Sequence, residues 1–157
     1  MINLSKIRRR LEVQSFLGLT DDELKSIGPW IRFTPVLNLT FMVIATALSS
    51  IPLLAGFAII MAAGAVMPVH PFDVLYNYLV RRITRTQPLP KSGVRRRIVF
   101  TIGAVWLLLT IVAFLYVSPA AGYIIGGLMA AFIVPLAAVH LCILSEGMAR
   151  IFGPPLK

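Results

Sequence analysis

The stretch HPFDVLYNYLVRRITRTQPLPKSGVRRR, residues 70–97, decides the fold of this chain. It is basic and interrupted by prolines, and it separates two pairs of apolar segments. In its first half, apolar side chains recur at the spacing of one helix face: Phe72, Leu75, Tyr76, Leu79, Val80 and Ile83. The opposite face carries Asp73, Asn77, Arg81 and Arg85. This pattern predicts an amphipathic helix over residues 71–84 that lies on a membrane surface with its charged face in water.

The second half of the stretch ends this helix and leads into the next apolar segment. Residues 87–93 read QPLPKSG, a sequence that cannot continue a helix. An arginine triplet then stands directly before an apolar run, which is typical of the cytosolic edge of a membrane helix. We therefore expect anionic lipid headgroups to contact Arg81, Arg82, Arg85, Arg95, Arg96 and Arg97.

The composition is that of an integral membrane protein. Of the 157 residues, 58% are hydrophobic and only 13% are charged. The formal net charge of +9 is spread over segments that flank apolar runs, so it predicts contact with anionic lipids and not with nucleic acid. The sequence holds a single cysteine, Cys142, which excludes an internal disulfide and a multi-cysteine metal site.

Four apolar runs predict four transmembrane helices, over residues of about 33–49, 51–67, 98–117 and 122–144. Because short turns join the first to the second and the third to the fourth, we expect two helical hairpins. The expected fold class is an all-α membrane protein with the cytosolic interfacial helix 71–84 between the hairpins. The first two runs are short for a bilayer core, so a re-entrant pair is an alternative for them.

Residues 1–29 precede the apolar runs and predict a cytosolic arm. Thr20 and Glu23 have the spacing of a capping box, and Gly28-Pro29 supplies a stop, which together predict a short helix over residues 21–27. Residues 30–157 form the predicted membrane domain.

The distribution of charge predicts the orientation. All 15 Lys and Arg residues fall in the arm up to Arg32, in the central stretch, or in the tail from Arg150 onward. The two tight turns carry no charge. With four spans the three basic segments lie on one side, and the positive-inside rule assigns that side to the cytosol. We therefore expect an inner-membrane protein whose N- and C-termini are cytosolic.

The fourth run contains small residues that let another helix approach closely, namely Gly122, Gly126, Gly127 and Ala130. They serve either packing within the chain or contact with another subunit.

Two side chains near the end of the fourth run are candidates for chemistry. His140 can ligate a haem iron or a chlorophyll magnesium, but a bis-histidine haem needs a second membrane histidine, and His70 lies outside the spans. The alternative for His140 is a hydrogen-bonded histidine near the interface. Cys142 stands in a Cys-x-x-Ser arrangement with Ser145, where a thiol can carry a persulfide or be oxidised. The alternative for Cys142 is a small apolar filler.

No apparatus for ion transport or for common catalysis is visible. Between the ends of the predicted spans there is no Asp, Glu, Lys or Arg, although proton relays are built from such residues. Motifs of zinc proteases, nucleotide loops and serine nucleophiles are also missing. We therefore assign no catalytic residue and no metal site.

Three features together resemble a bacterial family of integral membrane proteins that is catalogued as a domain of unknown function. They are HPFD followed by YN within residues 70–77, Leu89-Pro90 before the arginine triplet, and CILS at residues 142–145. The resemblance covers about residues 30–152 and implies about four membrane helices. Many members close the fourth helix with Cys-x-x-Cys and an aromatic residue. Ser145 replaces the second cysteine here, which weakens any dithiol role that the resemblance implies.

We interpret the chain as a non-catalytic subunit that packs against and stabilises a larger membrane complex, such as a respiratory or photosynthetic one. Its expected partners are membrane lipids and other membrane protein subunits. One alternative is a thiol-dependent redox or sulfur-handling protein that acts through Cys142. A second alternative, and the one that requires a cofactor, is a haem or chlorophyll carrier that uses His140.

Overall fold

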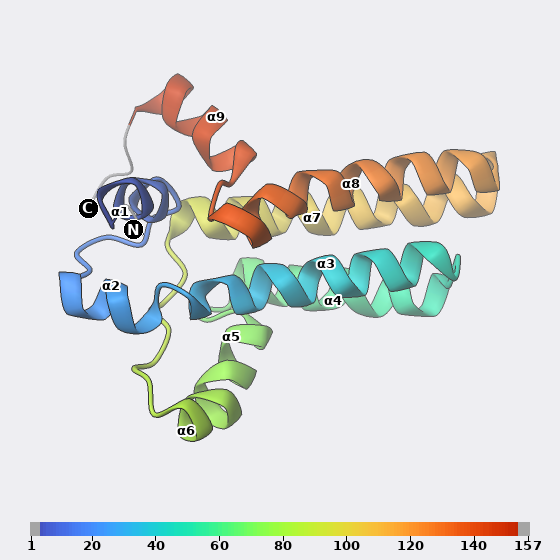
Figure 1. Ribbon diagram of the computed structural model, residues 1–157. Helices are drawn as coiled ribbons and strands as arrows, with labels where there is room; N and C mark the ends of the chain where they lie inside the picture. The colour runs from blue at the N-terminus through green and yellow to red at the C-terminus, as the bar shows by residue number, and fades with distance from the viewer. Residues whose placement is uncertain (1–3, 154–157) are drawn as a thin grey trace.

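The computed structural model describes residues 4–153, and over this range the chain forms helices and no strand (Figure 1). The first three residues of the predicted arm and the last four of the predicted membrane domain lie outside the described residues. Four long helices run side by side, namely α3 (Phe33–Ala47), α4 (Ile51–Val66), α7 (Val94–Val112) and α8 (Pro119–Val139).

Three helical segments are long and apolar enough to cross a membrane: Trp30–Ala47, Val94–Val117 and Pro119–Val139. The first includes the 3-10 turn η1 (Trp30–Arg32), and the second includes the π-helical turn η3 (Ala113–Val117). With 16 residues, α4 is about 24 Å long, shorter than a hydrocarbon core of about 30 Å. The helical segment that follows, residues 71–84, is bent by 84° from α4. Only the two together are long and apolar enough to count as a fourth span. The prediction of an all-α membrane protein is confirmed over the described residues, where three of the four predicted membrane helices are long and apolar enough to span by themselves and the fourth only together with the helix that follows it.

The four long helices share one core. The most extensive packing joins α4 to α7 and α3 to α8. Helices that follow each other in the chain, α3 with α4 and α7 with α8, pack less extensively. Large side chains fill the space between them, among them Met42, Phe57, Leu107 and Met129. The Trp106 indole N–H also donates to the carbonyl oxygen of Ile125 at 3.0 Å, which ties α7 to α8.

Two short turns close the bundle at the end away from α1 and α2 (Figure 1). Ser49 adopts a left-handed backbone with φ +48° after α3, and its hydroxyl donates to Tyr123 Oη at 2.7 Å. Ser118 caps α8 by accepting the Ala121 N–H at 3.1 Å, and Pro119 follows at the first helical position. The structure thus ends and starts helices at the positions where the sequence has its uncharged turns.

Residues 71–84 form one helical segment made of α5 (Pro71–Leu75), the π-helical turn η2 (Tyr76–Val80) and α6 (Arg81–Thr84). The predicted apolar face divides in two. Tyr76 is fully buried within the protein, whereas Leu79 and Ile83 are 60% and 81% exposed. The π-helical turn has more residues per turn than an α-helix, so side chains beyond it rotate away from the face that Phe72 and Tyr76 define.

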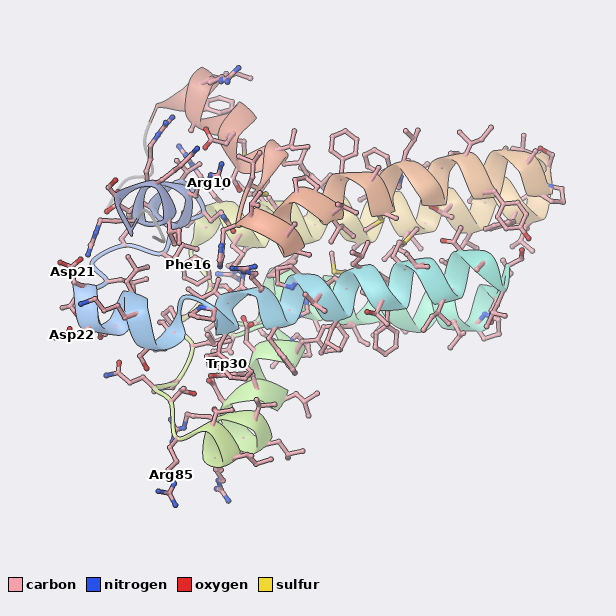
Figure 2. The ribbon with its side chains drawn as sticks, in the orientation of Figure 1. Arg10, Phe16, Asp21, Asp22, Trp30 and Arg85 are labelled. Carbon is pink, nitrogen blue, oxygen red and sulfur yellow. The ribbon has the colours of Figure 1, made fainter. Side chains whose placement is uncertain are left out.

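Asp73 corrects one sequence-based expectation. The helical pattern places it on the face that lies in water, but its exposed fraction is 0%. Arg85, at the end of the same segment, has a left-handed backbone with φ +53° and extends away from the bundle (Figure 2).

The N-terminal arm packs on one end of the bundle. It contains α1 (Leu4–Val13) and α2 (Asp21–Ile27), and α2 begins with a capping box between Thr20 and Glu23. A second core holds the arm in place, formed by the buried residues Leu11, Phe16, Leu24, Ile27, Ile31, Tyr76 and Leu89. We call this end, which carries α1, α2, α5, α6 and α9, the charged end of the bundle.

The fourth predicted span, expected to reach residue 144, ends earlier in the structure. α8 stops at Val139, and His140 follows with φ +58°, a left-handed conformation that terminates the helix. A new helix, α9 (Ile143–Phe152), then leaves at an angle to α8 (Figure 1). His140 and Cys142 therefore lie in the break between two helices.

Candidate functional site

A buried ion pair joins α7 to α5 at the charged end of the bundle. Arg96 Nη1 lies 2.6 Å from Asp73 Oδ2, and Arg96 Nη2 lies 3.1 Å from Asp73 Oδ1. The Thr34 hydroxyl, at the start of α3, donates to Asp73 Oδ1. Both carboxylate oxygens thus have donors, as a buried charge requires.

The guanidinium group of Arg96 is also enclosed by aromatic rings. It lies 5.0 Å from the ring centroid of Phe16 and 5.3 Å from that of Phe100. Phe16 belongs to the loop after α1 and points from the arm toward the bundle (Figure 2). Arg96 therefore connects the arm, α5 and α7 through one side chain.

His70 lies beside this ion pair, directly before α5. Its Nδ1 accepts the Phe72 N–H at 3.2 Å, which caps the helix. Its ring packs against Gly64, where an added Cβ would come within 2.1 Å of His70 Cδ2. Burial lowers the pKa of His70 to about 4, although the Asp73 carboxylate opposes this shift. His70 is therefore neutral at pH 7, and its buried Nε2 has no hydrogen-bond partner within residues 4–153.

A second group of buried polar atoms lies where α3, α8 and α9 meet. Cys142 is the N-cap residue of α9, and Ser145 lies in the first turn of that helix. Together with Asn38 and Arg96 they line a cavity of about 30 Å³. Asn38 Oδ1 and Ser145 Oγ are buried and have no hydrogen-bond partner in the described part of the chain. Two of the residues that line the cavity with Cys142 thus carry buried oxygens without a partner in the described part of the chain.

A second cavity, of about 70 Å³, adjoins the first. The two share the side chains of Asn38, Phe100 and Cys142. The second cavity extends between α7 and α8 to Trp106 and Met129, and its walls are almost entirely apolar. Cys142 therefore lies between a small cavity that has some polar side chains in its walls and a larger one that is almost entirely apolar.

His140 has its hydrogen bond within the protein. Its Nε2 lies 2.8 Å from the Gly28 carbonyl oxygen, and since a carbonyl only accepts, this nitrogen carries the proton. Burial lowers the pKa of His140, while the bond to Gly28 opposes the shift. This hydrogen bond joins the arm to the break after α8. It also occupies one of the two ring nitrogens through which His140 could bind a metal.

Of the four small residues of α8 singled out from the sequence, three pack within the chain and one faces open space. A Cβ at Gly122 would come within 2.4 Å of the Phe114 ring, and one at Gly126 would come within 2.6 Å of Thr46. Ala130 packs against the core of the bundle. At Gly127 an added Cβ meets no atom within 4 Å. Packing within the chain thus accounts for Gly122, Gly126 and Ala130.

The six arginines expected at lipid headgroups occupy different environments. Arg82 and Arg85 are exposed and Arg81 is half-buried. Arg97 donates to the carbonyl oxygens of Ala65 and Val66, at 2.8 and 2.6 Å. Arg95 and Arg96 are buried, and Arg95 donates to the Gly153 carbonyl. The structure gives these last two residues partners within the protein in place of an open face toward headgroups.

Sequence reasoning missed the Arg96–Asp73 pair and the cavity at Cys142. One signal could have found the pair, because Asp73 is the only acid between Glu23 and Glu146, and it lies in a basic segment. A single acid among cations is a candidate for a buried ion pair. For Asn38, helical spacing alone gives no sign that its side chain meets residue 142.

Comparison with known proteins identifies the family. A family described as a domain of unknown function (DUF4395) matches residues 29–146. This range includes the Arg96–Asp73 pair, His70, and the cavity residues Asn38, Cys142 and Ser145. No curated protein and no solved structure matches the chain. Since the match covers most of the sequence, the chain belongs to the DUF4395 family.

Proposed function

We propose that this protein acts through the thiol of Cys142 as a membrane redox or sulfur-handling protein. The observation that supports the proposal is the cavity that Cys142 lines together with Asn38 and Ser145, whose buried side-chain oxygens have no hydrogen-bond partner within residues 4–153. A buried polar atom without a partner costs free energy, so a native protein retains one where water or a ligand satisfies it.

The size of the cavity limits what can reach the thiol. A water molecule needs about 10–15 Å³ of this kind of space. The cavities of about 30 and 70 Å³ therefore suit a few waters or a small inorganic sulfur species, and they are too small for a peptide or a macrocycle. This favours a polysulfide over a bulky disulfide as the reactant.

The reaction that fits a single cysteine is transfer of a sulfane sulfur. After the thiol loses its proton to solvent, Cys142 Sγ attacks the terminal sulfur of an inorganic polysulfide. The new S–S bond forms a persulfide on Cys142, the next S–S bond of the polysulfide breaks, and the shortened polysulfide leaves as a dianion. Cys142 is the N-cap residue of α9, so the positive end of that helix dipole lies beside the site of the attack.

The test is intact mass spectrometry of the purified full chain in detergent after exposure to polysulfide or to glutathione disulfide. We expect a persulfide on Cys142 and little mixed disulfide. The control is Cys142→Ser combined with Ala120→Cys, because Ala120 is exposed at the other end of the bundle. Its thiol should react with both reagents. A Cys142 that does not react with polysulfide in the folded protein, or that reacts with both reagents as Ala120→Cys does, contradicts the proposal.

The second candidate is the non-catalytic subunit of a larger membrane complex, and the observation that favours it is Gly127. This residue faces outward on α8 with open space above it, which lets the backbone of a helix from another subunit approach closely. Mild extraction followed by a native gel and mass spectrometry should then find the chain with other membrane proteins. Gly127→Leu should dissociate that complex, whereas Ile59→Leu on an exposed face of α4 should not. Migration of the wild-type chain only by itself would contradict this candidate.

The haem or chlorophyll carrier is tested by an absorption spectrum of the purified protein. Because His140 Nε2 bonds to Gly28, only its Nδ1 is left for a metal. A Soret or chlorophyll band that disappears in His140→Ala would establish the carrier. A colourless preparation from cells that make both pigments would dismiss it.

A further inference from the structure

A cavity at the charged end lies between α1 and α9, and we call it the α1–α9 groove. Its volume is about 480 Å³. The groove is lined by the cations Lys6, Arg9, Arg10 and Arg150, the acid Glu146, and the apolar side chains Leu141 and Ile143. It therefore combines positive charge with an apolar wall.

The positive charge of the groove is only partly compensated. Arg9 lies 3.9 Å from Glu146, and its side chain is 78% exposed, so this pair is long and solvated. Arg10 Nη1 donates to the Val139 carbonyl oxygen at 2.6 Å, which fixes the guanidinium against the end of α8. Arg150 is exposed on the opposite wall. Among the described residues of the groove, three arginines stand against one acid, and this excess of positive charge attracts an anion.

The groove lies at the level where a membrane helix ends. α8 stops at Val139, two residues before Leu141, and α9 then leaves the bundle beside α1 (Figure 1). The side chains of Ile151 and Phe152 on α9 are 76% and 78% exposed, although α9 also carries Arg150. A helix with exposed apolar and basic residues, placed at the end of a transmembrane helix, lies in the headgroup region. Figure 2 shows Arg10 at this junction.

We propose that the α1–α9 groove binds the headgroup of an anionic phospholipid. The phosphate lies among Arg9, Arg10 and Arg150, and the acyl chains follow Leu141 and Ile143 toward α8. A basic pocket beside a transmembrane helix has the character of sites for doubly charged headgroups. Because the cations come from both walls, a lipid with two phosphates binds more tightly than one with a single phosphate. This inference is independent of any chemistry at Cys142.

The test is native mass spectrometry of the purified full chain, titrated with diphosphatidylglycerol, phosphatidylglycerol or phosphatidylcholine. We expect retention of lipid in that order, with phosphatidylcholine not retained. The variant Arg9→Gln/Arg150→Gln should weaken binding of the anionic lipids roughly thirtyfold, since each basic residue near a membrane surface contributes about 1 kcal/mol. The matched control is Lys25→Gln/Lys91→Gln, with the same change of charge at two exposed positions outside the groove, and it should retain wild-type binding.

A third variant acts in the opposite direction and does not remove a cation. Glu146→Gln raises the positive excess of the groove and should tighten binding of the anionic lipids about fivefold. Glycerophosphate and a polyglutamate peptide, added as competitors, distinguish a lipid from a soluble anion or an acidic protein. Equal losses in the groove variant and its control, no effect of Glu146→Gln, or displacement of the lipid by either competitor at equal concentration would overturn the proposal.

Discussion

Arg96 holds Asp73 with both of its terminal nitrogens, across 23 positions of the chain and at 2.6 and 3.1 Å. The side chains are 10% and 0% exposed, so this pair is part of the interior. Because Thr34 also donates to Asp73 and Phe16 covers the guanidinium, the pair fixes the arm, α3, α5 and α7 relative to one another. The segment 71–84, which is bent by 84° from α4, is thereby anchored to α7.

Replacement of Asp73 by Asn should destabilise the protein strongly. The variant leaves the Arg96 guanidinium buried without its counter-charge, and removing one partner of a buried pair costs about 3–5 kcal/mol. Thermal unfolding in detergent, followed by circular dichroism, measures the loss. Asp22→Asn is the matched control, because Asp22 is exposed on α2 (Figure 2), and it should unfold close to the wild-type temperature. Equal effects of the two substitutions would contradict the structural role of the pair.

Arg96→Lys keeps the charge but should still destabilise the protein, by about 1–3 kcal/mol. An ammonium group cannot bond both Asp73 oxygens in the fork geometry, and it cannot lie flat between Phe16 and Phe100. The same unfolding assay measures the effect, with Arg82→Lys as the control at an exposed site. Full stability of Arg96→Lys would show that charge alone maintains this contact.

Stability should fall as pH is lowered from about 6.5 to about 4, in part because of His70. Burial lowers the pKa of His70 from 6.5 to about 4, so in this window the unfolded chain binds a proton that the folded chain does not. The stabilisation is complete above pH 6.5, is lost as pH falls toward 4, and amounts to a value on the order of 3 kcal/mol.

The variant His70→Asn isolates this contribution. An Asn side chain can cap α5 in place of Nδ1 but does not titrate, so the pH dependence of the unfolding temperature should become shallower. Some slope should remain, because burial also lowers the pKa of His140. An identical pH profile for the variant and the wild type would mean that His70 does not contribute.

The helices were predictable because their signals are local. Apolar length predicts the spans, and the hydroxyl of Ser118 followed by Pro119 marks the start of α8. The environment of Asp73 was not predictable from periodicity, because a regular helical wheel takes no account of a partner in α7. The exposure of Leu79 and Ile83 was missed because the wheel also takes no account of the π-helical turn η2. The early end of α8 depends on the left-handed backbone of His140, a conformation that a histidine adopts rarely and that the apolar pattern does not reveal.

The candidate site was predictable only in part, because some of its residues come together through tertiary packing. Cys-x-x-Ser is visible in the sequence and places residues 142 and 145 in one helical turn. Asn38, which also lines the cavity, is far away in the chain. Its place there depends on how α3 packs against α8. Such a contact is a tertiary property, and a single sequence without packing information does not contain it.

Gly126→Ala should destabilise the bundle, whereas Gly127→Ala should not. The methyl group at position 126 would come within 2.6 Å of Thr46 Cγ2, so α3 and α8 must move apart, at a cost of about 1–3 kcal/mol. At position 127 the methyl group meets open space, and alanine favours the helix by about 1 kcal/mol. Unfolding in detergent compares the two variants. The reverse order of stability would mean that α8 presents a different face to α3.

The orientation predicted from charge can be tested with cysteines at the two ends of the bundle. In a Cys142→Ser background, Arg85→Cys probes the charged end and Ala120→Cys probes the end with the uncharged turns, and both positions are exposed. If the basic residues face the cytosol, a membrane-impermeant maleimide added to spheroplasts should label Ala120→Cys, and it should label Arg85→Cys only after the membrane is broken. Labelling of Arg85→Cys in intact spheroplasts would show that the predicted orientation is wrong and that the charged end faces outward. The α1–α9 groove would then lie at the outer leaflet, and the anionic lipid that we propose for it would have to come from that leaflet.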